Sequence, residues 1–371
     1  MKRLVLAGGG HAHLSVLQAF AKNRSADTEL VLVTPNRYQY YSGMLPGWMA
    51  RHYREEDCRI DLAVWAERAG ARLVLSAVRR LNADARGFET AAGERLSYDL
   101  LSLDVGSETD DRTLVALGGR LLPVKPLDNF YARWPEVVQK AGQTPGFALA
   151  VVGGGAAGVE IALAARHALS TLGRQTHVHL VAARGGLLPG HAPGVQRRAA
   201  HCLAVAGVQV HEKRGVGTQD GILLDDGNLL PAHAAIAATG ARALPWLDDS
   251  GLALDINGFV QVNSQHRSIS HATVYAAGDT CARTDLALQR SGVHAVRAGP
   301  ILAHNLRAAV AGEAPLPYRP RKRSLYLLAC GPRYAVASWG GFSAEGAWVW
   351  RWKNRLDQGF VRRFSGSMQP L

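Results

Sequence analysis

Residues 149–166 read LAVVGGGAAGVEIALAAR, and this stretch indicates the fold class. An apolar run typical of a buried strand leads into Gly153, Gly155 and Gly158, and a segment with helical character follows. The G-x-G-x-x-G spacing is that of a strand, tight turn and helix that hold a dinucleotide pyrophosphate on backbone amides. We therefore predict a dinucleotide-binding unit around these three glycines.

The alternative for this stretch is a membrane-spanning helix, because residues 147–165 are the longest apolar segment of the chain. Three consecutive glycines and the charged Glu160 oppose that interpretation, since a spanning helix needs about 20 apolar residues without charge. We expect a strand, a turn and a helix instead.

A second copy of the design lies near the start of the chain, where residues 3–20 read RLVLAGGGHAHLSVLQAF. It keeps Gly8 and Gly10, which approach the phosphates, but has His13 where the third glycine is expected. Each copy is followed by strand-like runs in the same order, at 29–35, 70–82 and 98–107 and again at 177–184, 207–217 and 232–241. The repeat predicts an α/β fold with two Rossmann-like units, each a parallel sheet in a three-layer arrangement.

A third motif, TVYAAGDTCA at 273–282, ends a further strand in Gly278 and Asp279. Placed after two glycine cradles, it resembles the second flavin motif of flavoproteins with two dinucleotide-binding domains. The resemblance covers nearly the whole chain and is to the pyridine nucleotide-disulfide oxidoreductase superfamily. It is closest to type II NADH dehydrogenase-like flavoproteins, and among them to a group sometimes fused ahead of selenophosphate synthetase. The runs that carry it are GGGHAH (8–13), YYSGMLPGW (40–48), YDLLSLDVGS (98–107) and RSGVHAVRAGPILAHNL (290–306).

The resemblance implies three domains. Residues 1–115 and 257–315 would form a discontinuous FAD-binding domain, interrupted by an NAD(P)-binding domain at 140–256. Residues 316–371 would form a small C-terminal domain that covers the flavin. The implied enzyme is an FAD-dependent NAD(P)H dehydrogenase that passes hydride to the flavin and electrons to a quinone or another small acceptor.

Two residues are candidates for the chemistry. Lys125 falls where the resemblance places a basic residue near the flavin, and its charge would stabilise the reduced cofactor; a solvated or interdomain lysine is the alternative. Glu160 falls where the superfamily often has a glutamate near the nicotinamide, and a carboxylate in this apolar helix needs polar partners. We assign no catalytic triad, because hydride transfer needs little acid–base machinery.

Cofactor contacts follow from the motifs. The strand at 177–184 ends in Ala182 and Ala183 rather than in an acid, and Arg184 follows, which favours NADPH slightly over NADH. Thr34 similarly replaces the acid expected at the flavin ribose. The predicted FAD contacts are Gly8, Gly10, His11, Thr34, Gly278 and Asp279, and the predicted NAD(P)H contacts are Gly153, Gly155, Gly158, Arg184 and Gly240.

The four cysteines, at 58, 202, 281 and 330, form no C-x-x-C and no zinc-like cluster, so we expect reduced thiols and no metal. Without a redox cysteine pair, disulfide reduction is disfavoured. A sulfide- or selenium-compound:quinone oxidoreductase stays open as an alternative, with Cys281 or Cys330 at the flavin. So does a protein that binds FAD and NAD(P)H and senses redox state with little turnover.

Basic charge concentrates at the end of the chain. The net charge is +12, and residues 319–371 contain ten basic and two acidic residues. The segment 348–364, WVWRWKNRLDQGFVRRF, suits an amphipathic helix on an anionic membrane surface, and burial of its tryptophans against the flavin domain is the alternative. We expect a cytoplasmic protein, peripheral on the membrane in the first case, without a signal peptide and without nucleic-acid binding, because no known module accompanies the charge. The sequence does not indicate an oligomeric state.

Overall fold

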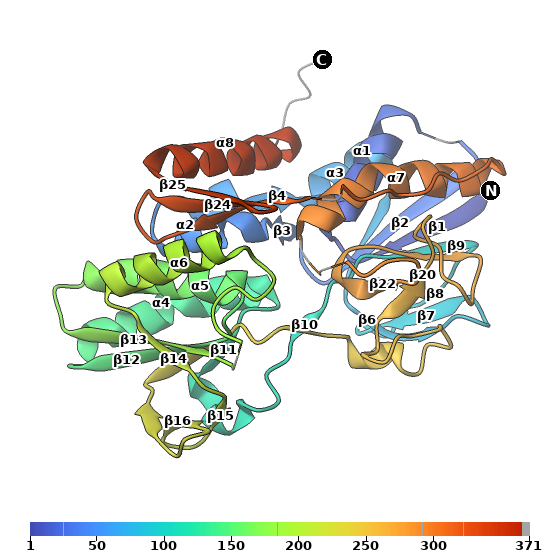
Figure 1. The fold of residues 1–371 in the computed structure, drawn as a ribbon. Helices are drawn as coiled ribbons and strands as arrows, with labels where there is room; N and C mark the ends of the chain where they lie inside the picture. Colours follow the sequence, from blue (N-terminus) through green and yellow to red (C-terminus); the bar gives the residue numbers. More distant parts are fainter. Residues whose placement is uncertain (25, 184, 289, 291, 322, 366–371) are drawn as a thin grey trace.

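A computed structural model describes residues 1–24, 26–183, 185–288, 290, 292–321 and 323–365 (Figure 1). Its first unit contains a five-stranded parallel sheet with the order β21-β9-β1-β2-β5. The strands are β1 (Lys2–Ala7), β2 (Thr28–Thr34), β5 (Arg72–Leu75), β9 (Leu100–Leu103) and β21 (Val274–Ala276). The helices of this unit are α1 (His11–Lys22), α3 (Leu62–Ala69) and α7 (Gly292–Ala311).

The other face of this sheet is covered by a second set of elements. An antiparallel meander, β6 (Val78–Asn82), β7 (Gly87–Thr90) and β8 (Arg95–Ser97), packs Phe88 and Leu96 against Val5 and Val31 of the sheet. Helix, sheet and meander give the three layers expected from the sequence.

The second unit repeats this plan with the strand order β11-β18-β12-β13-β14. Its strands are β11 (Leu121–Pro123), β12 (Phe147–Val152), β13 (Thr176–Ala182), β14 (Gln209–Glu212) and β18 (Ala234–Ala237). Its helices are α4 (Leu127–Gln143), α5 (Ala156–Ser170) and α6 (Pro193–Ala206), and its meander is β15 (Gly215–Gly217), β16 (Gly221–Leu224) and β17 (Leu229–Pro231). The predicted fold class is confirmed, and residues 149–166 form the central strand and its helix.

Short elements complete and connect the two units. The two segments that connect the units pair with each other as the antiparallel strands β10 (Glu108–Thr109) and β19 (Ala241–Arg242). The others are β3 (Tyr38–Tyr40), η1 (Ser42–Met44), α2 (Leu45–Met49), η2 (Glu55–Cys58), β4 (Arg59–Asp61), η3 (Val115–Arg120), η4 (Pro245–Leu247), β20 (Val260–Val262), η5 (Gly278–Thr280) and β22 (Cys281–Arg283).

The C-terminal segment forms the antiparallel sheet β23 (Leu325–Ala329), β24 (Ala335–Trp339) and β25 (Phe342–Gly346), followed by α8 (Ala347–Phe364). In Figure 1 it lies across the upper side of the molecule, beside α6. It bonds to both units: Trp65 Nε1 of α3 donates to Phe364 O at 2.7 Å, and Arg198 of α6 forms an ion pair with Glu345. No helix of the described residues is long and apolar enough to cross a bilayer.

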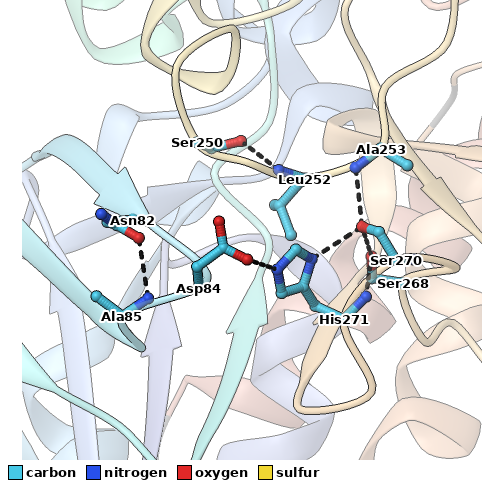
Figure 2. A network of polar contacts seen from close by, with 9 residues as sticks. All are labelled: Asn82, Asp84, Ala85, Ser250, Leu252, Ala253, Ser268, Ser270 and His271. Atoms are coloured by element: carbon cyan, nitrogen blue, oxygen red, sulfur yellow. Dashed lines mark hydrogen bonds and ion pairs between the residues drawn. The ribbon is translucent and has the colours of Figure 1, made fainter.

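Figure 2 shows a polar network that joins the first meander to the loop before β21. His271 Nε2 lies 3.1 Å from Asp84 Oδ1, and His271 Nδ1 lies 2.9 Å from Ser270 Oγ. The chain of contacts from Ser270 through His271 to Asp84 resembles a hydrolase triad. However, Ser270 Oγ accepts a hydrogen bond from the amide of Ala253 at 2.9 Å and forms another with Ser268 Oγ at 3.2 Å. We interpret this network as a clamp between loops.

Candidate active site

The first glycine cradle is shaped by contact with β9. Gly8 has φ +96°, and its amide donates to Val33 O of β2 at 2.7 Å. A Cβ on Gly8 or on Gly10 would lie closer than 3.0 Å to Asp104, which follows β9. Only glycine therefore fits at both positions of this turn.

Asp104 supplies the cap that α1 lacks in its own sequence. The N-cap of α1, Gly10, has no side chain, and Asp104 Oδ2 accepts the amides of Ala12 at 2.8 Å and His13 at 3.1 Å. The Gly10 amide donates to the Asp104 carbonyl at 3.2 Å. Asp104 is only 4% exposed, and burial raises its pKa to about 7. Sequence inspection missed this residue, because it lies about 90 positions from the helix that it caps.

His13 explains how the cradle tolerates the loss of its third glycine. Its Nδ1 lies 2.6 Å from Gly8 O and its Nε2 lies 2.8 Å from Ser102 Oγ of β9. Burial lowers its pKa to about 4, so the ring is neutral. Because a carbonyl only accepts, Nδ1 carries the proton and Nε2 accepts from the Ser102 hydroxyl. His13 thus packs α1 onto the sheet by hydrogen bonds instead of by close backbone contact.

The second cradle has the same backbone plan without an internal carboxylate. Gly153 has φ +132° and donates to Val181 O at 2.8 Å, and a Cβ on Gly158 would overlap Gly153 O. Gly155, the N-cap of α5, makes no side-chain cap bond, and a Cβ there would meet nothing within 4 Å. The open side of Gly155 and the positive end of α5 fit a pyrophosphate.

A polar centre lies beyond the first cradle. Lys125 forms an ion pair with Asp279 of η5, and its ammonium donates to Ser107 Oγ at 3.0 Å. His11 lies within electrostatic reach of both; burial lowers its pKa to about 4. His11 also contacts the ring of Phe360 of α8, with centroids 5.9 Å apart. The structure therefore brings together three predicted site residues that are far apart in sequence.

The acidic and cationic partners suit the polar part of a flavin dinucleotide. Gly278 has φ +64°, and a Cβ there would lie closer than 3.0 Å to the Asp104 carboxylate. The turn at Gly278 and the first glycine cradle therefore both contact Asp104. Thr34 is buried at the end of β2, where its hydroxyl donates to Asn36 O at 3.3 Å. The residues that would hold FAD are the amides of the first cradle, Asp279 and Lys125.

Glu160 points from α5 toward the C-terminal sheet. Its Oε1 accepts the amide of Ala329 at 2.8 Å. Burial raises its pKa to about 7, and nearby Lys353 of α8 opposes that shift. Its predicted role at the nicotinamide stays a prediction, and what the structure adds is a contact between Glu160 and β23.

Strand β13, after which the sequence predicts the contact that selects the coenzyme, ends at Ala182, and Arg184 lies outside the described residues. Gly240 has φ +126° and open space at its Cβ position. No sequence motif pointed to Glu212, which lies on the adjacent strand β14 and pairs in register with Ala182. Its carboxylate lies 3.6 Å from the Cβ position of Gly186, in the loop after β13. An acid is therefore present beside this loop, supplied by the next strand.

Known proteins resemble the chain along most of its length. The family model described as pyridine nucleotide-disulphide oxidoreductase matches residues 2–305. An NADH dehydrogenase-like protein of Mycobacterium tuberculosis is 27% identical over 299 residues, covering 76% of this chain and 73% of that protein. A probable ferredoxin reductase of Castellaniella defragrans is 28% identical over 304 residues, covering 76% of this chain and 68% of that protein.

Solved structures show the same fold. The sulfide:quinone oxidoreductase of Aquifex aeolicus superimposes with a TM-score of 0.80 at 16% identity, over 98% of this chain and 92% of that chain. Putidaredoxin reductase, in its covalent complex with putidaredoxin, gives a TM-score of 0.74 at 20% identity, over 91% and 81% of the chains.

Proposed function

The chain belongs to the pyridine nucleotide-disulphide oxidoreductase family and is an FAD-dependent NAD(P)H oxidoreductase, and from this premise we propose that its electrons go to a quinone. The observation that carries the redox function is the pair of glycine cradles with the Lys125–Asp279 centre beside the first. We propose that residues 1–115 and 257–315 bind FAD, that residues 140–256 bind NAD(P)H and that residues 316–371 cover the flavin.

Bound flavin supplies the acceptance of hydride from a nicotinamide and the onward transfer of electrons. Asp279 is placed to accept a hydrogen bond from a sugar-alcohol hydroxyl, and Lys125 to place positive charge beside the reduced cofactor. Lys125→Ala then lowers the flavin reduction potential, while Lys125→Arg, which keeps the charge, retains most of it. An unchanged potential in Lys125→Ala, measured by dye-coupled titration of the loaded protein, would show that Lys125 only pairs with Asp279.

We propose that the chain prefers NADPH to NADH. Two features support this preference: alanines, Ala182 and Ala183, stand where NAD-binding strands end in an acidic residue, and the positively charged Arg184 follows them. Glu212 opposes this preference, because its carboxylate would repel a 2′-phosphate. Glu160 is assigned to the nicotinamide end, where its carboxyl group can accept or donate according to its protonation.

The quinone assignment is supported by an exposed apolar stripe on α8. Trp348, Trp352 and Leu356, spaced by four residues, are 51%, 40% and 49% exposed, and the exposed Arg351 and Arg355 flank them. Aromatic rings with arginines between them suit the headgroup region of an anionic bilayer, and lipid quinones dissolve in the apolar layer directly beneath it.

The structure corrects part of the expected aromatic and basic surface. Trp350 is 9% exposed and packs edge-on against His52, and Lys353 is buried against Asp357 at 2.8 Å. Helical geometry separates these two residues from the exposed stripe, because they lie on the opposite side of α8. The proposed membrane contact is therefore narrower than the sequence indicated.

Steady-state oxidation of NADH and NADPH against quinones, ferredoxins and dyes tests the acceptor. We expect turnover with quinones to exceed turnover with ferredoxins. Fast dye reduction without quinone reduction would refute the quinone assignment, and slow turnover with every acceptor would favour a redox-sensing protein.

Sedimentation with anionic vesicles tests the surface. The native chain should bind at low salt and be released at high salt, since exposed charges are screened over about 8 Å at physiological ionic strength. Trp348→Ala with Trp352→Ala should abolish binding. Ile256→Ala, which removes a fully exposed apolar side chain elsewhere, is the matched control and should bind like the native chain. Equal binding by all three proteins would contradict the assignment of the stripe.

A further inference from the structure

Two of the four cysteines meet at the boundary between the second unit and the C-terminal sheet. Cys202 lies on α6 and Cys330 directly follows β23; their thiols are close enough to shift each other's pKa, and both residues line one cavity. Neither Cys58 nor Cys281 takes part in this contact. The 128-residue separation of the two positions in sequence hid the pair from motif analysis.

The turn that carries Cys330 is pressed onto α5. Gly331 has φ +87°, and a Cβ there would lie 2.6 Å from Leu163 O, so only glycine permits this approach. The Cys330 amide donates to Tyr334 O at 2.9 Å, which closes the turn. Cys330 is therefore held in place, with its side chain 5% exposed, while Cys202 on the helix is half-buried.

Both thiols line a cavity of about 470 Å³ between α5, α6 and this turn. Its walls are mainly apolar and include Leu163, Val205 and Pro332. The charged or ionisable nitrogen groups of the lining are Arg166, His167 and His201, and no carboxylate is among the lining residues of the described chain. The cavity suits a small molecule with an apolar centre and anionic groups.

We propose that Cys202 and Cys330 are a redox dithiol that a small anionic disulfide, entering this cavity, oxidises to an intramolecular disulfide. Cys202 as thiolate attacks one sulfur of the incoming disulfide, and the other sulfur leaves as a thiolate, which takes up the proton lost by Cys202. Cys330 then loses its proton and attacks the Cys202 sulfur of the mixed disulfide, releasing the second small thiol. The protein loses two electrons and two protons, and the small disulfide gains them.

The two thiols differ in the way this sequence of attack requires. The neighbouring Cys330 thiol lowers the pKa of Cys202, which favours the Cys202 thiolate, whereas the Cys202 thiol and burial raise the pKa of Cys330. Cys202 is also the more accessible of the two. Cys202 is thus the attacking thiol and Cys330 the resolving thiol.

The bond would staple the second unit to the C-terminal sheet. This interface already contains the Arg198–Glu345 ion pair and a 2.9 Å hydrogen bond between His191 Nδ1 and Ser338 Oγ. A covalent link here restricts the unfolded chain and fixes the sheet relative to α6. The oxidised protein should therefore melt at a higher temperature than the reduced protein.

The test treats the native, flavin-loaded chain with glutathione disulfide, followed by acid quenching, alkylation and peptide mapping. We expect a Cys202–Cys330 disulfide peptide, with Cys58 and Cys281 alkylated as internal controls. Cys330→Ser should stop at a stable glutathione adduct on Cys202, and Cys202→Ser should leave Cys330 unmodified.

Two results would overturn the proposal. In the first, all four thiols of the native chain can still be alkylated after treatment. In the second, glutathione remains bound to Cys202 of the native chain and no Cys202–Cys330 disulfide forms. Both are read from the native chain, so the test holds even where a serine variant fails to fold. The readout does not depend on turnover, which keeps it separate from the quinone assignment.

Discussion

The contact between Gly10 and Asp104 gives a quantitative prediction about the first cradle. Gly10 has φ −66° and ψ 172°, which alanine adopts without strain, so Gly10→Ala acts only through its new Cβ. That Cβ would overlap the Asp104 carboxylate, which must leave the amides of Ala12 and His13. Each bond to a charged acceptor is worth about 1.5–3 kcal/mol, and relief of carboxylate burial offsets part of the loss. We expect Gly10→Ala to lower the free energy of unfolding by about 2–4 kcal/mol and to release flavin.

A double-mutant cycle isolates this contact. In an Asp104→Ala background the added methyl meets no carboxylate, so the further cost of Gly10→Ala should fall close to zero, a coupling of about 2–4 kcal/mol. Gly155→Ala is the matched control, because Gly155 is also an extended N-cap but has open space around it. It should leave stability unchanged.

Urea unfolding followed by tryptophan fluorescence measures the four corners of the cycle, with flavin content read in parallel. An equal cost of Gly10→Ala with and without Asp104 would refute the overlap argument. It would show that Gly10 is required for cofactor approach alone.

Three further predictions concern charge. Burial raises the pKa of Asp104 to about 7, above its value of about 3.9 in the unfolded chain, so its contribution to stability is full below pH ~4 and is lost as pH rises through about 7. Asp104→Asn should therefore flatten the dependence of the unfolding free energy on pH between these values, and an unchanged slope in denaturant titrations would contradict it. Lys353→Met leaves Asp357 buried without its cation and should lower the free energy of unfolding, measured by thermal unfolding, by roughly 3–5 kcal/mol. Adding Asp357→Leu to the same chain should restore most of this loss. No recovery would mean that Lys353 stabilises the fold through other contacts. Arg184→Ala should weaken the binding of NADPH by about 1–3 kcal/mol with little effect on the binding of NADH, whereas Glu212→Gln should raise the preference for NADPH. Both effects are measured as the ratio of kcat/KM for NADPH to kcat/KM for NADH. Parallel losses of kcat/KM for both coenzymes would assign Arg184 a structural role.

Much of the backbone plan was readable from the sequence. Gly8 and Gly153 occupy turns with positive φ, and Gly158 lies against the Gly153 carbonyl, so local backbone sterics require glycine there. Strand and helix periodicity depends on neighbours a few residues apart, which is why both units and their order could be predicted.

Side-chain partners across the fold could not be read in this way. Asp104 caps α1, Glu212 faces the loop after β13, and Cys202 meets Cys330 because sheet register and helix packing bring distant segments together. Their signals in sequence are single ordinary residues without fixed spacing. The glycine turns and the repeated strand and helix pattern could be predicted, since they follow from local sterics and periodicity. Which buried charges and thiols meet is visible only in the folded chain, because it depends on contacts between elements that lie far apart in sequence.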